Sequence, residues 1–137
     1  MKPVLLDTGV IVALLDRSEK YHTQCVAAIQ ELDQPLVTCE AVISESCYLL
    51  REVNGAPETV LENVEQGMFQ LTFQLMHSAN AVKGIMRKYR NIPADFADAC
   101  LVHLADILDT GAILTLDSDF LTYRWRRTRH FEMLIEL

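Results

Sequence analysis

Four acidic residues stand where the surrounding sequence predicts either burial or the end of a strand. Asp7 interrupts the apolar run VLLDTGVIVALL, and Asp117 follows the apolar run AILTL. Glu45 and Asp98 lie inside predicted helices, and most of the residues three and four positions away from them are apolar. A buried carboxylate without a partner is costly. We therefore expect these four side chains to face the interior and to share a compensating partner.

Carboxylates that converge at one point repel one another unless something neutralises them. Two unit charges 4 Å apart cost about 4 kcal/mol at an effective dielectric constant near 20. Either the acids take up protons, which raises their pKa values, or they bind a divalent cation. Oxygen ligands without an accompanying His or Cys favour Mg²⁺ or Mn²⁺ over zinc. The sequence thus predicts a Mg²⁺ or Mn²⁺ site.

Helix capping is the competing interpretation of several of these acids. Asp7 precedes one predicted helix, Asp95 precedes another, and Asp117 precedes the short turn SDFLTY. An aspartate in such a position commonly accepts a hydrogen bond from a backbone N–H of the first turn. Taken singly, each is better interpreted as a cap. For the four acids as a set, capping is insufficient. It leaves Glu45 and Asp98 unexplained, because both are expected within a helix and facing inward.

The elements that would position these acids alternate along the chain. The strands are expected at residues 3–7, 36–38, 68–73, 112–116 and 131–137, and the helices at 8–16, 19–32, 40–53, 57–67, 76–90 and 92–111, the last closed by Gly111. This order indicates an α/β fold with a mostly parallel sheet of four to five strands. Ligand sites in such folds lie at the carboxyl ends of the strands, where Asp7 and Asp117 are expected.

Composition restricts the class of protein. The chain has 137 residues, 50% of them hydrophobic and 23% charged, which indicates one globular domain spanning residues 1–137. The net charge of −7 makes a generic nucleic-acid binder a poor interpretation. The four cysteines form no C-x-x-C pair. With neither a signal peptide nor a membrane span in the sequence, we expect a soluble cytoplasmic protein with reduced thiols.

The order of these motifs resembles a known family. Four motifs follow one another in this order: LLDTGVIVALL, ISESCYLL, PADFADACLVHLAD and ILTLDSDF. On these motifs the chain resembles the PIN domain, and within that family the VapC-type toxins of toxin–antitoxin pairs. The resemblance runs from Val4 to about Phe131. It implies a three-layer α/β/α fold that cleaves single-stranded or looped RNA with Mg²⁺ or Mn²⁺. It also implies a homodimer and an antitoxin whose C-terminal segment blocks the acidic site.

The same resemblance assigns roles to individual residues. It places the catalytic, metal-binding acids at Asp7, Glu45, Asp98 and Asp117. Asp95 and Asp119 are two further acids near the same cluster with an open role, and Asp117 and Asp119 could exchange roles. Thr8 and Thr115 match positions whose hydroxyls orient the carboxylates. Whether one or two ions bind stays open.

Hydrolysis of a phosphodiester needs a nucleophilic water, a neutralised phosphate and a stabilised leaving oxygen, which carboxylate-held Mg²⁺ can supply. Positive charge for the RNA must come from elsewhere, since the acids alone repel phosphate. The segment YRWRRTRHF offers candidates for RNA contact, namely Arg124, Arg126, Arg127, Arg129 and Trp125, with Tyr123 beside them. A solvated basic loop, or a site for an acidic partner, explains this segment equally well.

Other functions remain to be weighed. A receiver domain would carry a further acidic pair after its first strand, a haloacid-dehalogenase phosphatase would show D-x-D there, and a P-loop nucleotidase needs G-x-x-x-x-G-K; the sequence has none of these. Two alternatives stay open: a non-catalytic PIN-like module that binds RNA or protein, and an RNA-maturation nuclease without an antitoxin.

Overall fold

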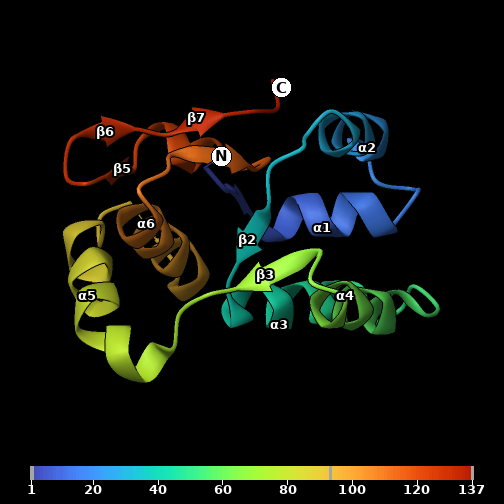
Figure 1. Ribbon diagram of the computed structural model, residues 1–137, viewed down its shortest axis with the longest axis horizontal. Helices are drawn as coiled ribbons and strands as arrows, with labels where there is room; N and C mark the ends of the chain where they lie inside the picture. The colour runs from blue at the N-terminus through green and yellow to red at the C-terminus, as the bar shows by residue number, and fades with distance from the viewer. Residues whose placement is uncertain (1, 93, 137) are drawn as a thin grey trace.

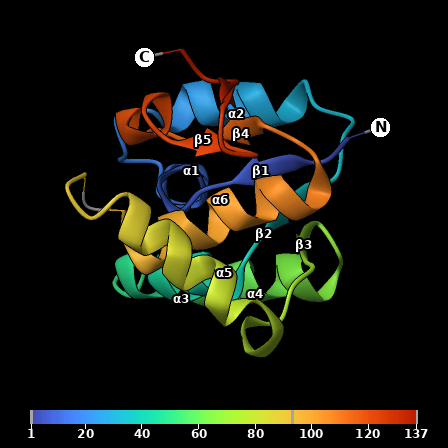
Figure 2. The same cartoon turned by 90° about the vertical axis from the view of Figure 1, so that its left-hand side faces the viewer.

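Five parallel strands form the centre of the molecule in a computed structural model that describes residues 2–92 and 94–136. In spatial order the strands are β3 (Phe69–Leu71), β2 (Leu36–Thr38), β1 (Val4–Leu6), β4 (Ala112–Leu114) and β7 (Glu132–Met133). The helices are α1 (Thr8–Leu15), α2 (His22–Gln30), α3 (Glu40–Leu49), α4 (Ala56–Glu65), α5 (Leu75–Lys88) and α6 (Phe96–Leu108), followed by the 3₁₀ helix η1 (Ser118–Leu121). Helices α1–α4 lie on one side of the sheet, and α5 and α6 on the other (Figures 1 and 2). This arrangement confirms the expected α/β/α fold.

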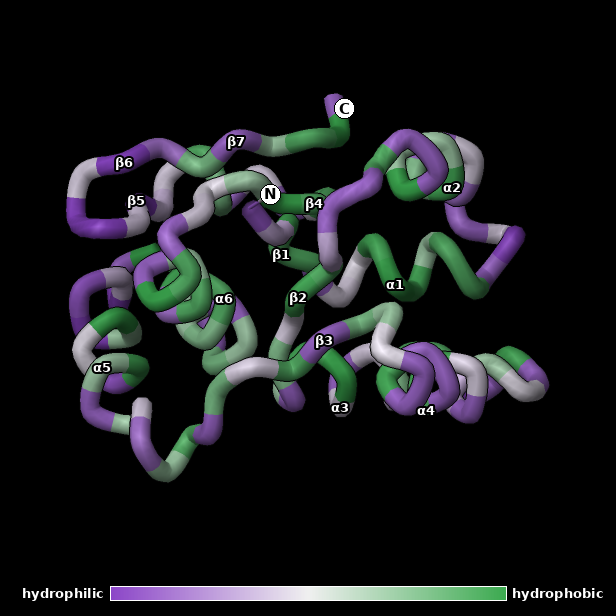
Figure 3. Tube along the Cα trace, in the orientation of Figure 1, coloured by the Kyte–Doolittle hydropathy of each residue, from purple (hydrophilic) through white to green (hydrophobic). Residues whose placement is uncertain are grey.

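The central strands are buried on both faces, as a parallel sheet between two helix layers requires. All three residues of β1 and of β2 are buried. Helix α6 is buried along the whole run of residues 97–105, so it packs against the sheet and against α5. Figure 3 shows the hydrophobic residues gathered on β1, β4 and α1, with hydrophilic ones toward the outside.

The pairing of β1 with β4 brings two distant segments together. Leu6 is in register with Leu114, and the Asp7 N–H donates to the Leu114 carbonyl at 3.0 Å. On the other side of β1, the Thr38 hydroxyl donates to the Leu6 carbonyl at 2.7 Å. The residues that follow β1 and β4 therefore leave the sheet side by side, at its carboxyl edge.

Several element boundaries differ from the sequence-based expectations. Helix α3 ends at Leu49 instead of residue 53. The helix expected at 92–111 is α6, capped by Asp95, and Pro93 lies outside the described residues. The strand expected at 131–137 is limited to β7, and Leu137 also lies outside the described residues.

The end of α6 corrects the role given to Gly111. Asp109, with φ of 54°, takes the left-handed conformation at the C-cap. Gly111 instead makes room for a side chain, because a Cβ there would lie 2.1 Å from Nε1 of Trp125. A glycine near a helix end thus serves packing at this position, while an aspartate ends the helix.

A two-stranded antiparallel hairpin was not expected from the sequence. Its strands are β5 (Arg124–Trp125) and β6 (Arg129–His130), and β5 packs along α6. At the turn, Arg126 and Arg127 have positive φ values of 44° and 71°. Arginine is rare at turn positions with positive φ, so the sequence contained no signal for a hairpin and was consistent with a basic loop.

Within residues 2–92 and 94–136, none of the helices combines the length and the apolar character that crossing a bilayer requires.

Candidate active site

Three carboxylates meet at the carboxyl edge of the sheet. One oxygen from each of Asp7, Asp98 and Asp117 lies within 4.8 Å of the others. Asp7 follows β1, Asp98 lies in the first turn of α6, and Asp117 follows β4. They line a cavity of about 400 Å³, whose wall also includes Glu45 and Asp95. The expected convergence of acids that are far apart in the sequence is thus observed for three of them, and Glu45 shares the cavity.

Capping and clustering occur at the same residues. Asp7 is the N-cap of α1, and its Oδ1 accepts from the Thr8 N–H at 2.8 Å. Asp117 caps η1 by accepting from the Asp119 N–H at 2.9 Å, and Asp95 caps α6 by accepting from the Asp98 N–H at 2.8 Å. Each cap occupies one carboxylate oxygen. The positive N-terminal end of a helix also favours the ionised carboxylate.

Thr115 links two of the acids. Its hydroxyl donates to Oδ2 of Asp7 at 2.7 Å and accepts from the Asp117 N–H at 3.0 Å. Because Thr115 is fully buried, both contacts are protected from water. The single hydroxyl therefore sets the spacing between Asp7 and Asp117.

Thr8 offers a second hydroxyl at the cavity. The residue is 4% exposed and lines the wall beside Asp7. Among the described residues, its Oγ1 has no hydrogen-bond partner. A buried hydroxyl is normally paired, so this atom is suited to a ligand or water in the cavity.

Glu45 does not face the core, contrary to the sequence-based expectation. Its side chain is exposed, as are those of Tyr48 (62%) and Leu49 (50%) on the same helix. Apolar neighbours at helical spacing predicted burial, but Val42 is the only one of them that is buried, and the two that follow Glu45 lie on the surface. Glu45 instead lies at the mouth of the cavity, where partial burial, Asp95 and Asp7 raise its pKa.

Burial and mutual repulsion favour protons at this site. Burial, together with the charges of Asp95, Asp7 and Asp117, raises the pKa of Asp98 to about 7, and the hydrogen bond from the Tyr123 hydroxyl opposes the change. Burial also raises the pKa of Asp7, although the hydrogen bonds from Thr115 and Thr8 oppose the change. The cluster therefore carries a charge conflict that protons or a cation must relieve.

The two additional acids differ in their positions. Asp95 is exposed but lines the cavity, and its charge raises the pKa of Asp98, Glu45 and Asp7. Asp119 is half-buried and contributes its backbone N–H to Asp117. Of the two acids in the D-S-D-F run, Asp117 is the one whose carboxylate belongs to the group of three.

Tyr123 is a site residue that sequence reasoning did not identify. Its hydroxyl donates to Oδ2 of Asp98 at 3.1 Å, and its side chain is fully buried. In the sequence it is one aromatic residue in a basic segment. Nothing in local spacing connects it to an acid 25 positions earlier.

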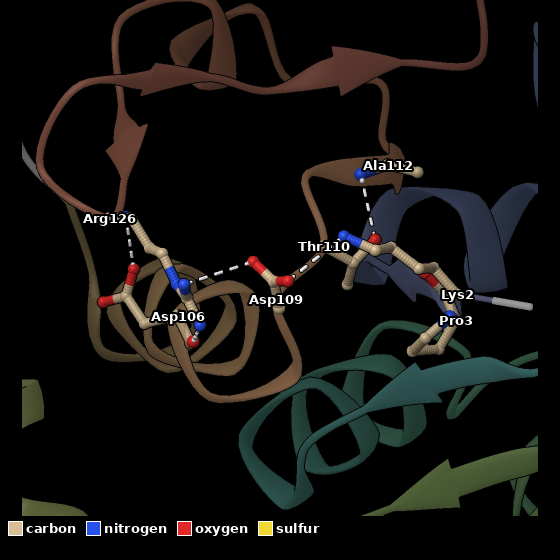
Figure 4. A network of polar contacts seen from close by, with 7 residues as sticks. All are labelled: Lys2, Pro3, Asp106, Asp109, Thr110, Ala112 and Arg126. Atoms are coloured by element: carbon tan, nitrogen blue, oxygen red, sulfur yellow. Dashed lines mark hydrogen bonds and ion pairs between the residues drawn. The ribbon is translucent and has the colours of Figure 1, made fainter.

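Arg126, at the turn of the basic hairpin, lies away from the three acids. The Arg126 backbone N–H donates to the side chain of Asp106, and its guanidinium is 3.4 Å from Asp109, which also pairs with Lys2 (Figure 4). Residues 98 and 106 of α6 are eight positions apart, about 12 Å at 1.5 Å per residue. The structure therefore places Arg126 at the other end of α6 from the site.

Three other members of the segment make local contacts, and the fourth, Arg127, is exposed. The Arg124 guanidinium donates to the carbonyls of Leu121, Thr122 and Tyr123. Trp125 is only 7% exposed, its Nε1 donates to the His130 carbonyl, and the Arg129 guanidinium lies 5.1 Å from its ring centre. In this conformation the Trp125 ring is largely covered. RNA contact by this segment stays a prediction.

The donor set suits a hard divalent cation. Asp7, Asp98 and Asp117 offer carboxylate oxygens at mutual distances that one ion can span. Oxygen ligands of this kind suit Mg²⁺ or Mn²⁺. The raised pKa values and the unpaired Thr8 hydroxyl fit a site that gains from binding a positive ion.

Comparisons with known proteins agree with this fold. A family model described as "PIN domain" matches residues 4–125. Ribonuclease VapC26 of Mycobacterium tuberculosis is 30% identical over 116 residues, covering 83% of this chain and 86% of that protein. The crystal structure of Mycobacterium tuberculosis VapC20, a Sarcin-Ricin loop cleaving toxin, superposes with a TM-score of 0.81 over 92% of this chain and 98% of that one. Its identity of 14% makes this a likeness of fold.

Proposed function

This chain belongs to the PIN domain family, and we propose that it is a metal-dependent endoribonuclease that hydrolyses RNA phosphodiester bonds as the toxin of a type II toxin–antitoxin pair. The observation that carries the proposal is the group of Asp7, Asp98 and Asp117, whose oxygens lie within 4.8 Å of one another. The 30% identity to a VapC ribonuclease over most of both chains supports the choice of RNA as substrate.

In the proposed mechanism, Asp7, Asp98 and Asp117 would hold Mg²⁺ or Mn²⁺, and Glu45 lines the same cavity. When bound, such an ion would neutralise the phosphate charge and supply Lewis acidity for the attack of water. The residues of the chain keep the donors in place: the caps and Thr115 hold the carboxylates against their mutual repulsion. In this proposal Glu45 accepts a proton from water; its raised pKa and its exposed carboxylate support that role.

Cleavage of RNA tests the proposal directly. Purified protein with Mn²⁺ should cleave a mixture of structured RNAs, and EDTA should stop the reaction. Asp7→Asn should lower the rate by about 100-fold or more, because it removes a ligand charge. The matched control is Asp33→Asn. Asp33 is exposed, and it is not one of the described residues that line this cavity. It should leave the rate unchanged.

A different result would favour one of the alternatives. If wild type and Asp7→Asn are equally inert over many RNAs while RNA still binds, the chain is a non-catalytic binding module. If the protein cleaves RNA but no small partner gene lies immediately upstream, an RNA-maturation nuclease becomes the better assignment.

The partners follow from the same proposal. We propose a cytoplasmic homodimer, inhibited by an antitoxin whose Arg or Lys side chain enters the acidic cavity in place of the metal. A structure of the complex without a basic side chain near Asp7 would contradict this mode of inhibition.

We also retain the proposed RNA contacts, Arg124, Arg126, Arg127, Arg129 and Trp125. An Arg127→Ala variant that binds RNA with unchanged affinity and salt dependence would count against them.

A further inference from the structure

We propose that Tyr123 is a positioning residue of the metal site, acting by holding the Asp98 carboxylate in the orientation that receives the cation. The inference rests on the proposed metal-dependent function and adds a residue to it. The contact that carries it is the hydrogen bond from the Tyr123 hydroxyl to Oδ2 of Asp98, at 3.1 Å.

The Asp98 carboxylate needs such a restraint because its neighbours repel it. Asp95, Asp7 and Asp117 all act on it electrostatically. A free aspartate side chain would lower its energy by rotating away from these charges. A hydroxyl donor on Oδ2 opposes that rotation and leaves Oδ1 available to a cation. The backbone is held as well, since the Asp98 N–H donates to Asp95.

The tyrosine ring is itself immobilised. Its centre lies 5.0 Å from that of Tyr89 and 5.0 Å from that of Phe120, both edge-on, and the side chain is fully buried. Edge-to-face pairs of this kind stabilise one ring orientation. The hydroxyl therefore has little freedom to leave Asp98. A tyrosine hydroxyl carries its proton at neutral pH, since its ordinary pKa is about 10, so it is a donor to Asp98.

Removing a single oxygen atom tests the inference. Tyr123→Phe keeps the aromatic ring and loses the hydroxyl. Mn²⁺ binding is measured by calorimetry without RNA, and unfolding is measured in EDTA. We expect Tyr123→Phe to bind Mn²⁺ about tenfold more weakly, the lower end of what loss of a hydrogen bond to a metal ligand typically costs. RNA cleavage should fall through kcat, with KM for RNA little changed.

Tyr89→Phe is the matched control. Tyr89 is 7% exposed, packs against the same ring, and its hydroxyl accepts from the Arg124 N–H at 2.9 Å. It should lose some stability in EDTA but retain its Mn²⁺ affinity within about twofold. If both variants lose affinity equally, the effect is one of packing and the proposal is wrong. Unchanged affinity in Tyr123→Phe would also overturn it.

A double-mutant cycle separates action through Asp98 from any other cause. In an Asp98→Asn background, Tyr123→Phe should weaken Mn²⁺ binding no further; an additional tenfold loss would contradict the proposal. The cycle is measured at a temperature below the unfolding transition of every variant. If wild type binds no Mn²⁺ at all, the proposed function fails. If wild type binds Mn²⁺ and Tyr123→Phe binds it equally, only the role of Tyr123 fails.

Discussion

At the level of single residues, one carboxylate serves two purposes. Asp7 and Asp117 each follow a strand, cap the helix that comes next and still present an oxygen to the group of three. A cap holds the side chain in one rotamer at little cost, because the backbone N–H needs an acceptor in any case. The capping interpretation and the metal-site interpretation of these aspartates are therefore both consistent with the structure, and the first supports the second.

Thr115→Val should weaken the site by removing the hydroxyl that joins Asp7 to the Asp117 backbone. We expect a 10- to 100-fold loss of Mn²⁺ affinity or activity. We also expect a loss of about 1–2 kcal/mol in the free energy of unfolding, since the Asp117 N–H loses its acceptor. Calorimetry and urea unfolding measure the two effects separately.

Thr110→Val provides the comparison for that variant. Thr110 is also buried, donates to the Pro3 carbonyl at 2.9 Å and accepts from the Ala112 N–H, but at the amino end of the sheet (Figure 4). It should lose similar stability and keep its Mn²⁺ affinity. Equal loss of affinity in both variants would mean that Thr115 acts through general stability alone.

At the level of elements, α6 connects the site to the hairpin. Its first turn carries Asp98, while Asp106 and Asp109 at its other end hold Arg126. Strand β5 runs beside it, so that Tyr123 reaches Asp98 and Trp125 covers Gly111. The hairpin thus secures the helix that presents one of the three acids.

Gly111→Ala should disturb this packing. Its Cβ would lie 2.1 Å from Nε1 of Trp125, so the indole or the backbone must shift. Overpacking of this kind costs about 1–3 kcal/mol. Urea unfolding measures the loss, and fluorescence of the single tryptophan should report the displaced indole.

Gly84→Ala should instead raise the free energy of unfolding. Gly84 lies within α5, and in the described part of the chain no atom comes within 4 Å of a Cβ placed there. Alanine in an open helical position stabilises by about 0.5–1 kcal/mol. Destabilisation by Gly84→Ala, or none by Gly111→Ala, would show that this account of the two glycines is wrong.

At the level of the whole molecule, the acidic cluster affects stability as well as chemistry. In the absence of metal, Asp98 has a pKa of about 7 when folded against 3.8 as its ordinary value. The folded protein therefore binds its proton more tightly than the unfolded chain does. The resulting stabilisation is complete below about pH 4 and is lost as the pH rises through 7. Burial also raises the pKa of Asp7 and Glu45, which adds to the effect.

In EDTA, the unfolding free energy of the wild type should fall between about pH 4 and about pH 7. The Asp98 contribution is on the order of 4 kcal/mol at most, from the size of its pKa change. His103 opposes it below pH 6.5, because burial lowers its pKa. Asp98→Asn isolates the effect: it should flatten the profile and be more stable than wild type at pH 8. Urea unfolding at several pH values would contradict this if Asp98→Asn and wild type gave parallel profiles.

Local sequence was sufficient to predict the alternation of strands and helices, the parallel sheet and the candidate site residues Asp7, Asp98 and Asp117. Periodicity, strand ends and helix caps depend on near neighbours along the chain, so a single sequence reveals them. Asp7 and Asp117 could be paired in advance because parallel strands must end at the same edge. Only the tertiary structure revealed four other features: the exposure of Glu45, the hairpin, the contact of Trp125 with Gly111 and the hydrogen bond from Tyr123 to Asp98. Each depends on which surfaces meet across long sequence separations, and side-chain packing decides that without leaving a local pattern.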